Sequence, residues 1–141
     1  MDGLSSAAGV IAVASIALQL AHNIKGLRTF WTNVRDAPQD IQFIVADLQL
    51  LSGILADIAF EAQHAEADES LTTVLISCLS RTQTLTASVK AIENDFESTR
   101  TFVKKWTAVK AVFKSEKVNK FQDVLEQLKS TLILAQQIQQ R

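Results

Sequence analysis

The side chains that could support metal or nucleotide chemistry are few and scattered in this 141-residue chain. Glu61 and His64 have the carboxylate-histidine spacing found in di-iron helical bundles, where the motif occurs twice. The other histidine, His22, has no glutamate three residues before it, so a solvated acidic helix end explains the pair better. The four glycines form no phosphate-binding loop. We therefore expect no metal, no cofactor and no nucleotide chemistry.

Cys78 is the single cysteine and the one candidate nucleophile. It falls on the apolar stripe of an expected helix, where a buried cysteine behaves as a small, inert apolar side chain. A lone cysteine forms no internal disulfide, which fits a reducing cytosolic compartment. The sequence thus predicts a protein that is not an enzyme.

The scarcity of helix breakers predicts an all-α fold. The chain holds 4 glycines and 1 proline, too few for the turns of a β-sandwich or barrel. Its content of 48% apolar and 21% charged residues is typical of a packed domain. We therefore expect residues 1–141 to form a single domain, a mostly antiparallel helical bundle of four to five helices.

Hydrophobic periodicity predicts helices over about 4–34, over 39–63 and from about residue 70, with a boundary near Asn94 and Asp95. The last third contains either one helix bent near Ser115 or, preferably, a short helix followed by a long one. Pro38 suits the first turn of the second helix, with Asp36 or Ala37 near its N-cap. Six residues of that helix repeat as heptad core positions: Ile41, Ile44, Leu48, Leu51, Leu55 and Ile58.

Charge is strongly segregated beneath a formal net charge of -1. Residues 36–97 hold 11 acidic and 2 basic side chains, whereas residues 98–141 hold 3 acidic and 9 basic ones. Near neutrality argues against a dedicated nucleic-acid-binding module. The basic residues gather, with Phe102, Trp106 and Phe113 between them, at Arg100, Lys104, Lys105, Lys110, Lys114, Lys117 and Lys120.

This basic segment admits several interpretations. It could lie against anionic lipid headgroups, with its aromatic side chains at the interface. It could also contact nucleic-acid phosphates or the acidic helices of its own bundle, or form a solvated face over a core that buries Trp106 and Phe113.

The start of the chain is a second informative feature. Residues 3–24 carry no formal charge if His22 is neutral, and this run is about long enough to cross a hydrocarbon core. Small residues four apart, such as Ser5 and Gly9, allow close helix approach both in lipid and in a soluble bundle. A helix buried at rest and exposed after activation would satisfy both interpretations.

Four stretches carry a resemblance to a known family: MDGLSSAAGVIAVAS (1–15), DAPQDI (36–41), VADL (45–48) and KKWTAVK (104–110). With these, the chain resembles the fungal N-terminal domain of STAND proteins, a group of the HeLo-like class. The resemblance covers essentially the whole chain. It implies a helical bundle at the head of a fungal NOD-like receptor, or of a separate partner protein.

The resemblance also implies a role in programmed cell death, heterokaryon incompatibility and innate immunity. In that class an activating signal is thought to expose the first helix, which inserts into the plasma membrane and forms pores. The resting protein would be cytoplasmic. The positions that match the membrane-active, glycine-zipper element are Gly3, Leu4, Gly9, Val10, Ile11, Ala12, Val13 and Ile16.

We therefore expect a membrane-targeting effector or signalling domain. Its partners would be anionic membrane lipid, further copies of itself and a NOD-like-receptor NTPase in the same or a separate chain, with no nucleic acid. The alternative is a helical adaptor that mediates oligomerisation through its helix faces and never touches lipid.

Overall fold

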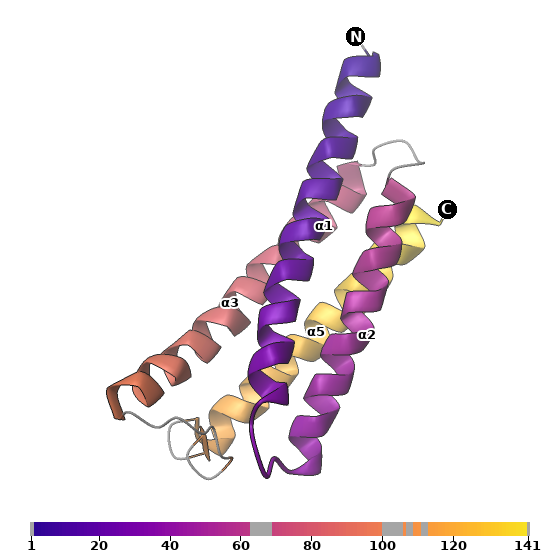
Figure 1. Ribbon diagram of the computed structural model, residues 1–141. Helices are drawn as coiled ribbons and strands as arrows, with labels where there is room; N and C mark the ends of the chain where they lie inside the picture. The colour runs from indigo at the N-terminus through magenta and orange to yellow at the C-terminus, as the bar shows by residue number, and fades with distance from the viewer. Residues whose placement is uncertain (1, 63–68, 100–105, 107–108, 111–112, 141) are drawn as a thin grey trace.

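The computed structural model describes residues 2–62, 69–99, 106, 109–110 and 113–140, with the backbone alone for 2–12, 95–99 and 115. The long elements of this part of the chain are all helices (Figure 1): α1 (Asp2–Thr32), α2 (Gln39–Ala62), α3 (Glu69–Thr99) and α5 (Ser115–Gln139). The predicted all-α bundle is confirmed.

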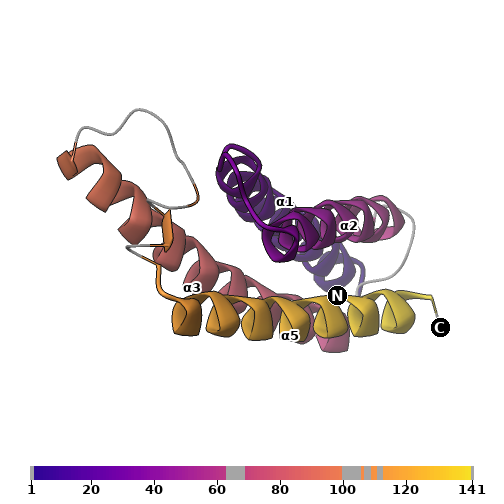
Figure 2. The same ribbon diagram turned by 90° about the horizontal axis from the view of Figure 1, so that it is seen from below.

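The four helices form an antiparallel ring. Their direction alternates along the bundle axis, from α1 through to α5 (Figure 1). α1 packs on α2 and α3, and α5 packs on the same two helices from the other side. The view from below shows α3 and α5 diverging toward the end where α3 stops and α5 starts (Figure 2). This divergence creates the groove described below.

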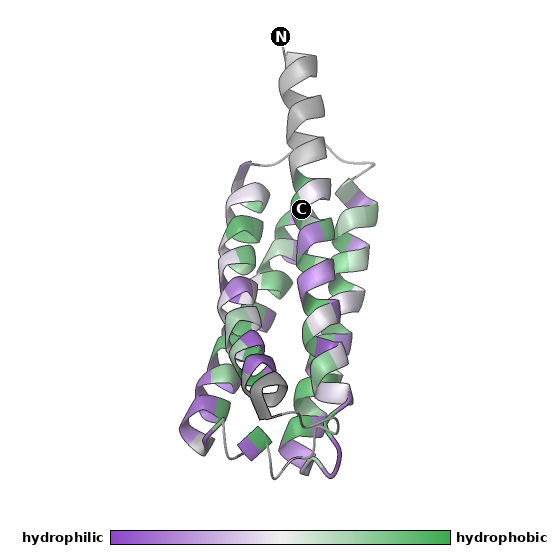
Figure 3. Ribbon diagram, turned by 60° about the vertical axis from the view of Figure 1, so that its left-hand side comes forward, coloured by the Kyte–Doolittle hydropathy of each residue, from purple (hydrophilic) through white to green (hydrophobic). Residues whose placement is uncertain are grey.

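The core follows the predicted hydrophobic faces. All six heptad residues of α2 are at most 2% exposed, and Leu20, Ile24 and Leu27 of α1 are equally buried. Hydrophobic and hydrophilic segments alternate along each helix, as expected for amphipathic helices around one core (Figure 3). The opposite side of α1 is more polar and is exposed at Ser15, Gln19, His22 and Gly26.

The connection between α1 and α2 corrects one expectation. The carbonyl oxygen of Pro38 accepts hydrogen bonds from the N–H groups of Ile41 (3.0 Å) and Gln42 (3.3 Å), so Pro38 itself is the N-cap of α2. Asp36 instead has φ 58°, in the left-handed region that short polar side chains tolerate. The cap therefore lies one or two residues later than predicted, because Asp36 is used to reverse the chain.

The second half of the chain confirms one predicted boundary and corrects another. α3 runs through Asn94 and Asp95, where the pattern indicates a boundary, because asparagine and aspartate lower helix propensity by only tenths of a kcal/mol. Lys114 has extended backbone and is the N-cap of α5, which confirms a break just before Ser115. The acidic helix end expected around Glu61 and His64 lies mostly at 63–68, outside the described residues.

Polar contacts fix the relative positions of the helices. The Asn23 side-chain amide on α1 donates to the Thr82 hydroxyl on α3 (3.2 Å). At the C-terminal end of α5, the Gln139 amide donates to the main-chain carbonyl of Ile58 on α2 (2.8 Å). These two bonds join the ring at two of its helix interfaces.

Candidate functional site

Cys78 lies in the core of the bundle on α3 and is 0% exposed. Burial raises the pKa of its thiol to about 11, against a smaller lowering by the Arg81 guanidinium. The thiolate, which is the nucleophilic form, is therefore scarce at neutral pH. This result confirms the prediction that Cys78 is a structural residue.

The candidate metal pair gains no support from the structure. Glu61 is exposed near the end of α2, and His64 lies outside the described residues. Within the described ranges, no three His, Cys, Asp or Glu side chains come close enough to hold a metal ion.

The predicted membrane-insertion residues all belong to α1. Gly3, Leu4, Gly9, Val10, Ile11 and Ala12 are in its first turns, and their side chains are outside the described part of the structure. Val13 is 2% exposed, and Ile16 is partly buried against the core. The last two members of the set are thus held inside the bundle, as the buried-at-rest interpretation expects.

The basic segment is only partly described, since Arg100, Lys104 and Lys105 lie outside the described residues. Its other four members are all exposed: Lys110, Lys114, Lys117 and Lys120. Among the salt bridges between described residues, none involves these four lysines. We call them the cationic patch.

Two aromatic residues of the basic segment, Phe113 and Trp106, pack against the core, and Phe102 lies outside the described residues. Phe113 is buried, with its ring 5.9 Å from that of Trp31 and 6.2 Å from that of Phe121. Trp106 is half-buried, and its backbone N–H donates to the Arg35 carbonyl (2.8 Å). Phe113 therefore anchors the segment to the core, which fits the interpretation of a cationic face over buried aromatics and not that of an interfacial side chain.

Three lysines of the cationic patch lie at the N-terminal end of α5, which is an unfavourable position for stability. Lys114 is the N-cap of α5, and Lys117 and Lys120 follow within its first two turns, with Glu116 as the acidic residue of the first turn. A helix N-terminus carries a partial positive charge, so cations there are destabilising and acidic residues are preferred. Stability alone does not explain this arrangement.

A different lysine joins α5 to the acidic helix α2. Lys129 of α5 lies 2.9 Å from the Glu126 carboxylate and 3.6 Å from that of Asp47 on α2. The hydrogen bond to Glu126 is the main cause that raises the pKa of Lys129, and Asp47 adds to it. Lys129 lies outside the basic segment, so among the described residues the idea that acidic helices hold that segment receives no support.

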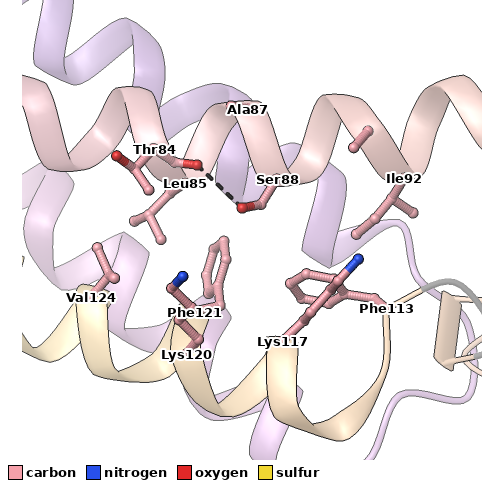
Figure 4. A pocket seen from close by; sticks show the side chains of 11 residues that line it. Thr84, Leu85, Ala87, Ser88, Ile92, Phe113, Lys117, Lys120, Phe121 and Val124 are labelled. Carbon is pink, nitrogen blue, oxygen red and sulfur yellow. Dashed lines mark hydrogen bonds between the residues drawn. The ribbon is translucent and has the colours of Figure 1, made fainter.

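The structure also contains a groove that the sequence does not predict. It lies between α3 and α5, has a volume of about 450 Å³ and includes Leu85, Ile92, Phe113, Phe121 and Val124 in its lining. Figure 4 shows Lys117 and Lys120 extending from α5 toward α3, with Thr84 and Ser88 on the opposite side. The only sequence signal was the i, i+3 spacing of the two lysines beside an apolar stripe.

These features define an all-α helical-bundle domain with a cationic patch and an apolar groove at one end. The family model described as the N-terminal domain of the pigment biosynthesis cluster protein PigL matches residues 1–138, so the chain belongs to this family. No curated protein and no solved structure matches the chain.

Proposed function

We propose that this domain is a membrane-targeting effector of programmed cell death or signalling, of the HeLo-like class, at the head of a fungal STAND protein or beside one. It acts without catalysis, and its activated form is a homo-oligomer at the plasma membrane. The family is named after a pigment biosynthesis cluster protein, and a domain of this kind would bring such a protein to a lipid surface.

The observation that carries the proposal is the cationic patch. Its four lysines are exposed, and no described carboxylate pairs with them. Each basic residue near an anionic membrane surface contributes about 1 kcal/mol to binding, whereas a lysine already neutralised by a partner would contribute less. Lys114 and Lys117 lie at the cap and in the first turn of α5, where cations cost stability, which favours a role in binding.

The first helix supports the second part of the proposal. Its uncharged run starts at Gly3, while its buried side chains within the described part start at Val13. Ala17 and Leu20 continue that buried face, which α2 and α3 cover. Full exposure of the helix therefore requires an activating signal that binds the opened state better than the resting one.

A second candidate function rests on α2. Within the described part of the chain, Gln39–Ala62 is the helix that is long and apolar enough to span a membrane. A third of its most apolar 18-residue stretch is buried inside the bundle. Its outer face exposes Phe43 (57%) and Leu50 (52%), two helical turns apart on one side. Such a stripe favours association with the same face of a second copy, as expected for an adaptor.

Liposome sedimentation tests the role of the patch. We expect the chain to sediment with vesicles containing phosphatidylserine and not with vesicles of phosphatidylcholine alone. The double variant Lys110→Gln with Lys114→Gln should lose much of this binding. The matched control, Lys25→Gln with Lys90→Gln, removes the same charge from exposed sites on α1 and α3 and should bind as before.

Dye release from anionic liposomes tests the first helix. Removing residues 1–20 would also delete the core residues Val13, Ala17 and Leu20, so substitution is the cleaner change. Val10→Glu with Ile11→Glu should abolish release while the circular dichroism spectrum stays helical. Unchanged release would remove the helix from the mechanism. The adaptor function is the correct one on two conditions. Phe43→Ser with Leu50→Ser must abolish self-association, and every variant must leave liposome sedimentation and dye release unchanged.

A further inference from the structure

We infer that the groove between α3 and α5 binds a medium-chain fatty acid, with the acyl chain in the groove and the carboxylate at Lys117 and Lys120. The inference rests on the proposed membrane-targeting function, and it names the class of lipid that this end of the bundle would bind. Its test uses soluble ligands and different lysines, so the two proposals can fail separately.

The walls of the groove suit an unbranched hydrocarbon chain. Phe113 and Phe121 are buried residues that line it from one side, and Leu85 and Ile92 line it from α3. Its volume of about 450 Å³ falls within the range of roughly 300–1,000 Å³ that is usual for small-molecule sites. A mostly carbon lining favours a ligand that is apolar over most of its length.

The polar groups of the groove lie where one charged end is needed. Lys117 and Lys120 are one turn apart on α5 and extend toward α3 (Figure 4). The hydroxyls of Ser88 and Thr84 opposite them already donate to main-chain carbonyls (3.2 and 3.3 Å), so the charged donors in the described lining are the two lysines. Two ammonium groups without a described carboxylate partner match one carboxylate, which would also be stabilised by the N-terminal end of α5.

Trp31 can report on the groove by its fluorescence, because it contacts two residues that line the groove. The ring of Trp31 lies 5.3 Å from that of Phe121 and 5.9 Å from that of Phe113, and both phenylalanines line the groove. The other tryptophan, Trp106, borders a separate small hollow on Phe113. A Trp106→Phe background therefore leaves Trp31 as the single tryptophan, whose emission should change when a chain displaces the phenylalanine rings.

The test is a titration of the Trp106→Phe chain with decanoate and dodecanoate below their micelle-forming concentrations. We expect saturable binding that tightens by up to about fourfold for each added methylene, because each buried CH₂ adds hydrophobic stabilisation. In the same background, Lys117→Gln with Lys120→Gln should weaken dodecanoate binding at least tenfold and leave dodecanol binding unchanged. The control pair Lys25→Gln with Lys90→Gln should leave both unchanged.

Ala91→Phe tests the location of the chain, because Ala91 lines the groove from an exposed position on α3 where a larger side chain leaves the core intact. It should abolish binding of dodecanoate and dodecanol alike. Binding that does not saturate would overturn the inference. So would a dodecanoate affinity that is unchanged by Ala91→Phe or by Lys117→Gln with Lys120→Gln, even if the chain still sediments with liposomes. Tighter binding of dodecyl phosphate than of dodecanoate would overturn the fatty-acid assignment in favour of a phospholipid.

Discussion

The side-chain amide of Asn23 donates a hydrogen bond to the hydroxyl of Thr82 across the interface between α1 and α3. Thr82 is 0% exposed, and its hydroxyl donates in turn to the Leu79 carbonyl (2.8 Å). A buried polar residue is tolerated here because its donor and its acceptor are both used. The pair sets the register of α1 against α3.

Asn23→Ala should lower the free energy of unfolding by about 1 kcal/mol, the usual net value of such a bond. A double-mutant cycle with Thr82→Val, measured by urea denaturation, should give a coupling energy of about 0.5–1.5 kcal/mol. If release of α1 activates the domain, Asn23→Ala should also speed dye release from anionic liposomes. Strictly additive effects of the two substitutions would contradict the bond.

Lys114→Asp should stabilise the domain. Lys114 is the N-cap of α5 and makes no side-chain capping bond. Aspartate can accept a bond from the first N–H groups and complements the helix dipole, so the gain should be about 0.5–2 kcal/mol, seen as a higher melting temperature. The same variant should bind anionic vesicles more weakly. If Lys114→Asp lowers both the melting temperature and vesicle binding, the patch has a structural role.

Cys78 should react with thiol reagents only when the protein unfolds. Its folded-state pKa of about 11 exceeds the ordinary value of 9.0, so the folded state holds its proton more tightly. The resulting stability is present below about pH 9 and is lost as pH rises toward 11. Denaturation across this range should show a fall in stability that is smaller in Cys78→Ala. Fast labelling of the native protein at neutral pH would contradict the burial.

The contact between Asp47 and Lys129 should contribute little and depend on salt. Both side chains are partly exposed, so Asp47→Asn should cost about 0.2–1 kcal/mol at low ionic strength and less at high salt. Glu126 remains as a second partner of Lys129, which limits the loss. Thermal melts of the original chain and of Asp47→Asn, at low and at high salt, would measure this cost in stability. A cost that is equal at both salt concentrations would point to packing.

The helices were predictable where one face repeats over many turns. The heptads of α2 identified a buried face because Leu48 and Leu55 can meet the core only in a helix. Details that depend on tertiary structure were missed. The left-handed backbone at Asp36 was missed although short polar residues tolerate it. The continuation of α3 past Asn94 was missed because asparagine and aspartate cost a helix only tenths of a kcal/mol.

The candidate site was predictable in composition and not in shape. Clustered lysines between Lys110 and Lys120 are visible in the sequence, as is their separation from the acidic residues. The groove exists because α3 and α5 diverge, which no local pattern encodes. That Phe113 faces Trp31 instead of lipid likewise depends on the rotation of a segment about its own axis.

The ring arrangement has a thermodynamic consequence for any switch in this domain. α1 shares both of its main neighbours with α5, so it cannot leave without uncovering the inner faces of α2 and α3 together. Departure of α1 is then the same cooperative event as opening the ring. If release of α1 activates the domain, heat, mild denaturant or a cavity in either neighbour should imitate the activating signal, and ordinary folding stability would set the threshold.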